Sequence, residues 1–167
     1  LSSFNESSST VYTATFTPTA DGAVTIDVAG STFTDASSNN NSAATQFNWT
    51  FDGSVPTITS TTIAFDNSTI AVTFSEAVYN TTGGSGALET SDFALSISGG
   101  TATLSSTTPS SISISLNVYT LGVSLSGTPN GSETLTVVPS SATAIYDGVN
   151  NAASTTQSNN TVALNEK

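Results

Sequence analysis

The side chains that carry much of enzyme chemistry are missing from this chain of 167 residues. It has no Cys, no His, no Met and no Arg, and its single side-chain cation is Lys167. Disulfides, zinc thiolates and catalytic groups built on His or Cys are therefore excluded. Carboxylate pairs remain, but a glycosidase cleft usually has more aromatic residues than one Trp and scattered Phe. We therefore expect a protein that is not an enzyme.

The charge is almost entirely of one sign. Twelve Asp and Glu residues give a formal net charge of −11. Nucleic acid and anionic lipid need Lys and Arg to neutralise phosphate, so we expect neither as a partner. Divalent cations are the natural counterions of such a chain.

No apolar run is long enough to cross a membrane, and no signal peptide is visible, so we expect no membrane insertion. The chain begins at Leu1 without Met, which suggests processing or truncation upstream. A composition without oxidisable Cys or Met is compatible with an exposed extracellular life. We expect an extracellular or cell-surface location.

Apolar and polar residues alternate through nearly the whole chain. Ser and Thr make up roughly a third of the residues, well above ordinary usage. Period-two alternation predicts strands with one buried face and one wet face. It recurs over residues 11–16, 24–28, 47–51, 70–74, 93–97, 112–116 and 135–137. No segment predicts a helix, so the sequence predicts an all-β fold of antiparallel sheets.

Turn residues separate these segments. Asp-Gly at 21–22, Asp-Asn at 66–67, Gly-Gly at 99–100 and Pro-Asn-Gly at 129–131 can each supply a positive or preset φ. We therefore predict turns or hairpin loops at these four places.

One stretch of the sequence occurs twice. Residues 131–151, GSETLTVVPSSATAIYDGVNN, have a weaker copy at residues 22–40, GAVTIDVAGSTFTDASSNN. In both copies a Thr-Pro leads into an alternating strand, and Phe33-x-Asp35 or Tyr146-Asp147 then opens an Asn-rich turn. A Val-Tyr-Thr lies upstream of each copy, at 11–13 and at 118–120. The repeat indicates two tandem modules.

The two modules are unequal in length. Residues 53–167 match the size of a complete seven-strand sandwich, whereas residues 1–52 contain only what corresponds to its C-terminal half. The Pro-containing segment 52–56 predicts the hinge between them. Half a sandwich leaves an apolar face uncovered, so we expect either a cut from a longer repetitive protein or a neighbouring copy that covers the half. Strand or sheet complementation between copies would build a filament.

These motifs, in this order, resemble the tandem bacterial immunoglobulin-like (Big-type) repeats of large secreted surface proteins and adhesins. In the second module the resemblance rests on residues 55–58, 71–78, 91–93, 130–137 and 145–150. In the first it rests on residues 12–18, 21–28, 34–35 and 39. It implies immunoglobulin-like antiparallel β-sandwich modules in tandem. It also implies a structural or adhesive role, with copies of the chain or adjacent repeats as partners.

Oxygen ligands gather at the expected loops and at the ends of the modules. Each Asn-rich turn begins with an Asp, the last strand of each module is followed by a carboxylate, and one Glu follows a strand near the same end of the sandwich. Because calcium prefers such oxygens, we predict a calcium site that fixes adjacent modules. The alternative is that these residues only form Asx turns. The candidate ligands are Asp35, Asn39, Asp52, Glu76, Asp147, Asn150 and Glu166, with Asn151 beside them.

Asn-x-Ser/Thr sequons are only slightly more frequent than chance gives in a chain so rich in these residues. In a eukaryotic secretory pathway they would be glycosylation candidates. They are Asn5, Asn40, Asn48, Asn67, Asn80, Asn130 and Asn159.

Trp49 alternates with Phe47 and Phe51 along the last strand of the first module, so we expect these rings to lie in a core. The competing interpretation is a sugar-stacking face, which would make the protein a carbohydrate- or ligand-binding module with cell-surface glycans as partners. A third is an accessory domain of a secreted enzyme. The sugar-binding alternative requires exposed rings among Trp49, Tyr79, Tyr119 and Tyr146.

Overall fold

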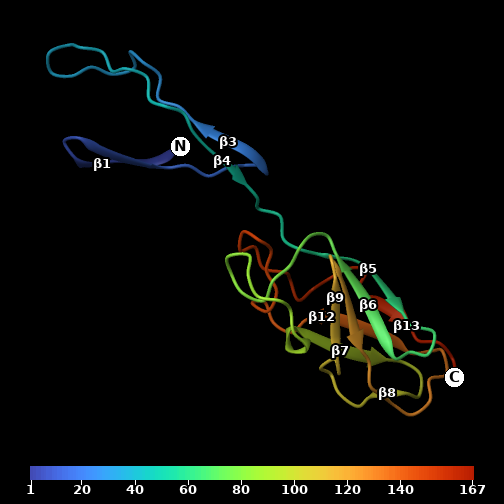
Figure 1. Cartoon of the computed structure of the whole chain (residues 1–167). Helices are drawn as coiled ribbons and strands as arrows, with labels where there is room; N and C mark the ends of the chain where they lie inside the picture. The colour runs from blue at the N-terminus through green and yellow to red at the C-terminus, as the bar shows by residue number, and fades with distance from the viewer. The chain divides into compact units, whose positions relative to one another are not determined.

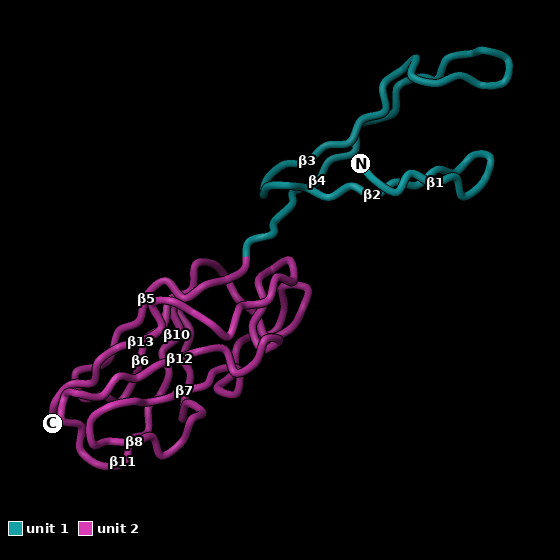
Figure 2. Tube along the Cα trace, turned by 180° about the vertical axis from the view of Figure 1, so that it is seen from behind, with its two compact units in different colours: residues 1–54 teal, residues 55–167 magenta.

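The computed structural model describes residues 1–167, which form two compact units (Figure 2). Unit 1 is Leu1–Ser54 and unit 2 is Val55–Lys167. Apart from one 3₁₀ turn, η1 (Thr90–Asp92), all regular structure is β-strand in antiparallel sheets. The all-β prediction is therefore confirmed. No helix is both long and apolar enough to span a lipid bilayer.

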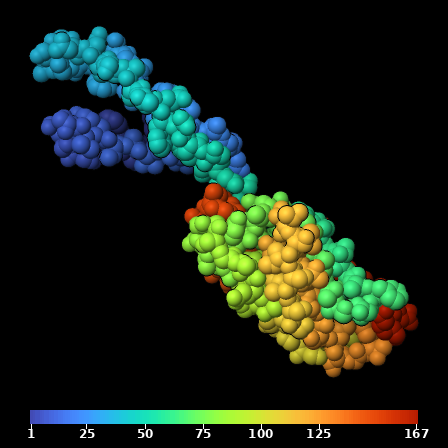
Figure 3. Space-filling view, in the orientation of Figure 1, coloured from blue at the N-terminus to red at the C-terminus, as the bar shows by residue number.

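Unit 1 consists of two hairpins (Figure 1). β1 (Ser2–Ser8) pairs with β2 (Val11–Thr15), and β3 (Gly22–Ile26) pairs with β4 (Phe47–Phe51). The alternation predicted the last three strands but not β1, whose sequence SSFNESS is mostly polar. The space-filling view shows the hairpins of unit 1 as two narrow arms (Figure 3). None of residues 1–54 is buried.

Unit 2 is a sandwich of two main sheets. The strand order is β5–β6–β10–β9 in one sheet and β13–β12–β7 in the other, and β8 and β11 form a short separate pair. The alternation did not predict β5, β8, β10 or β11. The strands are β5 (Ile58–Ile63), β6 (Thr69–Phe74), β7 (Phe93–Ser98), β8 (Thr103–Leu104), β9 (Ile112–Ser115), β10 (Val118–Gly122), β11 (Leu125–Ser126), β12 (Thr134–Pro139) and β13 (Thr161–Ala163).

The hydrophobic core lies between the two sheets of unit 2. β6 and β12 both bury every second residue, as period-two alternation requires. The rings of Phe74, Phe93 and Tyr119 pack together with centroids 5.6–6.4 Å apart. Fully burying one such side chain contributes about 1.5–3 kcal/mol. Burial of this kind therefore stabilises unit 2 in a chain with no disulfides and one Lys.

The predicted turns have the backbone conformations that their residues favour. Gly22, Asn67, Gly99, Gly100 and Gly131 all have positive φ. Such values carry no penalty for Gly and a reduced one for Asn. Local turn chemistry therefore set the ends of these strands.

Unit 1 repeats the second half of unit 2 in the order of its strands as well as in sequence. The hairpin β1–β2 corresponds to β9–β10, because β2 and β10 both begin with Val-Tyr-Thr. β3 and β4 correspond to β12 and β13 by the same repeat. The pairing differs: β10 also pairs with β6 and β12 also pairs with β7, whereas β2 and β3 each have a single partner.

Candidate functional site

The Asn-rich turn after β12 is organised by a buried carboxylate. Asp147 Oδ1 accepts hydrogen bonds from the N–H groups of Val149 and Asn151, both at 2.8 Å, and Oδ2 accepts one from Asn151 Nδ2 at 2.7 Å. Asn150, between them in sequence, has a φ of 83°, and its side-chain oxygen accepts a hydrogen bond from the N–H of Gly83. Asp147 is fully buried. Its partner in the turn is therefore Asn151, while Asn150 holds the neighbouring Gly-rich loop.

The same arrangement occurs in unit 1. Asp35 accepts hydrogen bonds from the N–H groups of Ser37 and Asn39 and from Asn39 Nδ2, all at 2.9 Å. The Asn39 side chain is the main cause that lowers the pKa of Asp35 below its usual value. The two turns have the same hydrogen bonds between the Asp and the Asn four residues later, so Phe33, two residues before Asp35, corresponds to Ile145 rather than to Tyr146. Both Asp side chains therefore form the Asx turns of the alternative interpretation.

A second carboxylate lies beside Asp147. One carboxylate oxygen of Glu76 and one of Asp147 are within 4.8 Å of each other. Glu76 follows Ser75, whose N–H donates to the carbonyl of Thr57 at 2.8 Å. The carboxylate pair therefore lies at the end of unit 2 where the chain enters at Val55. Two carboxylates at this separation are within reach of one divalent cation.

Of the other predicted ligands, Glu166 lies elsewhere in unit 2, and Asp35, Asn39 and Asp52 belong to unit 1. Glu166 follows β13, which pairs antiparallel with β12 so that Ala163 faces Thr134. Glu166 lies beside Gly131, before the start of β12, whereas Asp147 follows its end. Asp52 belongs to unit 1, where its Oδ1 accepts the N–H of Ser54 at 3.0 Å. Within unit 2, the structure therefore brings together Glu76 and Asp147 but not Glu166.

Glu133 is a buried carboxylate that the sequence did not indicate. Its Oε1 accepts the N–H groups of Thr101 at 2.7 Å and Ala102 at 3.0 Å, and its Oε2 accepts those of Asn130 at 3.1 Å and Gly131 at 3.0 Å. Backbone hydrogen bonds, of which the one from Ala102 has the largest effect, lower the pKa of Glu133 to about 2, although burial opposes them. Backbone N–H groups thus replace the missing basic side chains. The one available signal was a Glu two residues after the predicted turn at 129–131.

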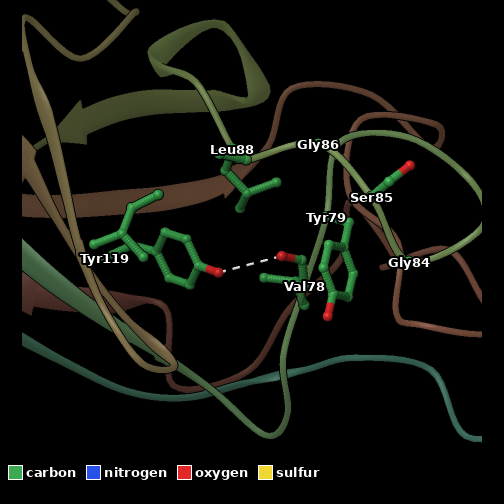
Figure 4. Close-up of a pocket in the computed structure, with 9 residues that line it drawn as sticks. Val78, Tyr79, Gly84, Ser85, Gly86, Leu88 and Tyr119 are labelled. Atoms are coloured by element: carbon green, nitrogen blue, oxygen red, sulfur yellow. Dashed lines mark hydrogen bonds between the residues drawn. The ribbon is translucent and has the colours of Figure 1, made fainter.

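An open hollow of about 370 Å³ lies in unit 2 between the Gly-rich loop and β10 (Figure 4). The hydroxyl of Tyr119 points to the backbone of Val78 and donates to its carbonyl at 3.3 Å, and Leu88 lies above the ring (Figure 4). Burial raises the pKa of Tyr119. The Ser85 side chain points away from the hollow (Figure 4). No carboxylate or basic group lines this hollow, so it offers no acid–base pair.

The four aromatic residues that would distinguish a sugar-binding face are partly or fully covered. Tyr119 is 3% exposed, and Trp49, Tyr79 and Tyr146 are half-buried. Trp49 meets the ring of Phe16 edge-on, with centroids 5.7 Å apart. These positions give little support to a flat stacking platform.

Other apolar residues of unit 1 are far more exposed than their counterparts in unit 2. Tyr12 is 53% exposed, whereas Tyr119, at the same place in Val-Tyr-Thr, is 3% exposed. Phe33 is 61% exposed, whereas Ile145, two residues before the equivalent Asp, is 0% exposed. Residues of unit 1 whose counterparts in unit 2 belong to the core therefore lie on the surface of unit 1.

The sequons differ in exposure. Asn67 is buried and its Nδ2 donates to the carbonyl of Asn165 at 2.8 Å, so the folded chain does not present this nitrogen to a glycosyltransferase. Asn80 is half-buried. The other sequon residues, Asn5, Asn40, Asn48, Asn130 and Asn159, are exposed.

Residues 1–51 match the family model of the bacterial Ig-like domain. Neither the curated proteins nor the solved structures include a match to the chain. The family match confirms the resemblance to Big-type repeats for these residues, and unit 2 adds an antiparallel β-sandwich. The fold class is therefore all-β, with immunoglobulin-like modules in tandem. Domains of this family are typically non-catalytic structural modules exposed at the surface.

Proposed function

We propose that this protein is a non-catalytic structural or adhesive module of an extracellular repetitive surface protein, and that unit 1 associates with another polypeptide of immunoglobulin type. The partner is an adjacent repeat or a neighbouring copy, and association between copies would build a filament. One observation carries the proposal: unit 1 repeats half of a folded sandwich, yet none of its side chains is buried. A sheet with an uncovered apolar face and unpaired edges is a template for strand or sheet addition.

The chemistry of the chain supports a non-catalytic role. The buried carboxylates Glu133 and Asp147 accept backbone hydrogen bonds that hold turns together. A general acid or base must instead reach a substrate, in a cleft that holds the reacting atoms. Together with the absence of His, Cys and Arg, this leaves the chain without an assembled catalytic group.

The association is testable by sedimentation over a range of protein concentrations. We expect the chain to self-associate weakly and Phe47→Asp to reduce that association, because Phe47 is 63% exposed on β4. Leu116→Asp is the matched control, since Leu116 is 91% exposed but lies in unit 2. A chain that stays monomeric at every concentration, or an equal effect of both variants, would contradict association between copies through unit 1.

Calcium is the cofactor that we propose for this module. Support comes from the Glu76–Asp147 pair at the entry end of unit 2 and from a net charge of −11. The part that Asp52 plays stays a prediction from the sequence. Calorimetric titration with Ca²⁺ should show binding that Glu76→Gln weakens, while Glu6→Gln, an exposed change in unit 1, leaves it unaltered. Binding that is absent, or that both variants reduce equally, would remove the metal from the proposal.

A further inference from the structure

We infer that unit 1 is the docking surface for one particular partner, the N-terminal half of an immunoglobulin-like repeat with strands equivalent to β5, β6 and β7. The inference rests on the proposed function, in which unit 1 has a polypeptide partner, and it specifies the chemistry of that partner. Unit 2 supplies the template, because it contains both halves in one chain.

Three edges of unit 1 lack a pairing partner, and in unit 2 the partners of all three equivalent edges belong to one segment of the chain. In unit 2, β10 pairs with β6 and β12 pairs with β7, whereas their counterparts β2 and β3 have no second partner. The third edge is at the Asp turn: Tyr146 forms a backbone bridge with Tyr79, whereas its counterpart Thr34 bridges only Asn40. The bridge in unit 2 consists of two N–H to carbonyl bonds of 2.7 and 2.8 Å. β6, β7 and Tyr79 all lie within residues 55–98, so one half module would complete all three edges.

The exposed surface of unit 1 is large enough for such a partner. Four aromatic side chains that are 53–76% exposed, Phe4, Tyr12, Phe33 and Phe47, present on the order of 500 Å² of apolar surface. A stable interface buries about 800 Å² per partner, and the paired strands would add to the aromatic contribution. Burial like that of Tyr119 and Ile145 in unit 2 would cover Tyr12 and Phe33.

The charges also fit strand pairing. β5, β6 and β7 have the sequences ITSTTI, TIAVTF and FALSIS, and β2 and β3 have VYTAT and GAVTI. None of these strands contains a charged residue. Like charges directly opposite each other on paired strands destabilise a sheet. These strands of a half module could therefore pair with β2 and β3 without such a repulsion.

A second copy of residues 1–167 cannot complete unit 1 without uncovering part of its own unit 2. Residues 1–167 contain one N-terminal half, in unit 2, and two C-terminal halves, one in each unit. Any exchange of halves between copies therefore leaves as many C-terminal halves uncovered as it covers. The occupant has to be an N-terminal half from another repeat.

The test adds such a half to the full chain. Residues 55–111 of this sequence are placed directly ahead of Leu1, so that the added strands precede β1 as they precede β9 in unit 2. The only Trp, Trp49, lies on β4 and reports on unit 1 alone. We expect Trp49 emission to shift to shorter wavelength and to resist acrylamide, and amide exchange of β2 and β3 to slow at least about a hundredfold. The extended chain should stay monomeric where the original chain self-associates.

Two variants distinguish docking from a general effect of length. Phe93→Asp in the added segment alone should abolish the protection, because Phe93 is 1% exposed in unit 2. Phe33→Ala should destabilise unit 1 in the extended chain and leave the original chain almost unchanged. Trp49 that is equally quenched with and without the extension would overturn the inference, and sedimentation of the original chain would still decide the proposed function. Trp49 protected in a dimer of the original chain would overturn the inference in favour of a second copy. Trp49 protected in a monomer of the original chain would overturn both.

Discussion

Ile145→Ala is the substitution that tests most directly how the core of unit 2 is built. Ile145 is 0% exposed and lies two residues before Asp147, at the position that Phe33 occupies in unit 1. Its backbone carbonyl also accepts the N–H of Ala153 at 2.9 Å, which joins the two sides of the turn beside this buried side chain. Removing three carbons from such a site leaves a cavity that its surroundings fill only in part.

The expected cost is about 3 kcal/mol, within the range for Ile-to-Ala changes in protein cores. For a domain of this size the urea dependence is about 2 kcal/mol per molar, so the midpoint should fall by about 1.5 M. Circular dichroism during urea unfolding measures it, because every buried residue lies in unit 2 and the cooperative transition belongs to that unit. Phe33→Ala should lower the free energy of unfolding by no more than about 0.5 kcal/mol, because Phe33 is largely exposed.

Val149→Ala is the control within the same turn, because Val149 is 52% exposed. If Ile145→Ala lowers the midpoint no more than Val149→Ala does, the turn is not anchored in the core. If Phe33→Ala costs as much as Ile145→Ala, unit 1 has a core of its own and the contrast between the units is wrong.

Three further predictions concern the polar contacts of unit 2. The pKa of Glu133 is lowered from 4.5 to about 2, so the ionised Glu133 stabilises the fold fully above pH 4.5, and this stabilisation is lost as the pH falls towards 2. In Glu133→Gln the urea midpoint should therefore change less with pH in this range. Asn67→Ala should cost about 2–4 kcal/mol in thermal unfolding, because it removes hydrogen bonds to Asn165 and because Ala tolerates the φ of 61° at this position less well than Asn does. Asn67→Gly should recover about 1 kcal/mol of this, and equal costs would exclude a conformational contribution. Gly100→Ala should destabilise the fold more than Gly83→Ala does in urea unfolding. Both glycines have positive φ, but a Cβ at Gly100 would lie 2.1 Å from the Glu133 carboxyl group, whereas a Cβ at Gly83 would meet no atom within 4 Å. Similar costs for the two variants would refute the role of the Glu133 contact.

Much of the local structure followed from the sequence. Alternation located the strands β6, β7, β9 and β12, because a strand between solvent and core needs apolar residues at every second position. It failed for β1 and β5, whose Ser and Thr residues are too similar in polarity to mark a face. Gly and Asn at the turns were informative because they tolerate positive φ better than other residues.

The candidate site was only partly accessible in this way. The repeat singled out Asp35 and Asp147, and the structure shows that both organise the same turn. It could not show that Asn151, not Asn150, is the hydrogen-bond partner of Asp147, since neighbouring Asn residues look alike in sequence. Glu133 was missed because its burial depends on two turns, 30 residues apart, that approach each other only in the folded sheet.

The sequence by itself determined the all-β class and the turns, since both depend on residues close together along the chain, and the presence of a repeat, since that needs only a comparison of two stretches of sequence. Only the tertiary structure decided which strands pair, and with that which apolar residues are buried. Tyr12 and Tyr119 occupy the same local motif, yet one is 53% exposed and the other 3%, because only β10 has β6 and a second sheet against it. Burial is a property of the partner as much as of the residue, and the partner strand is distant in sequence.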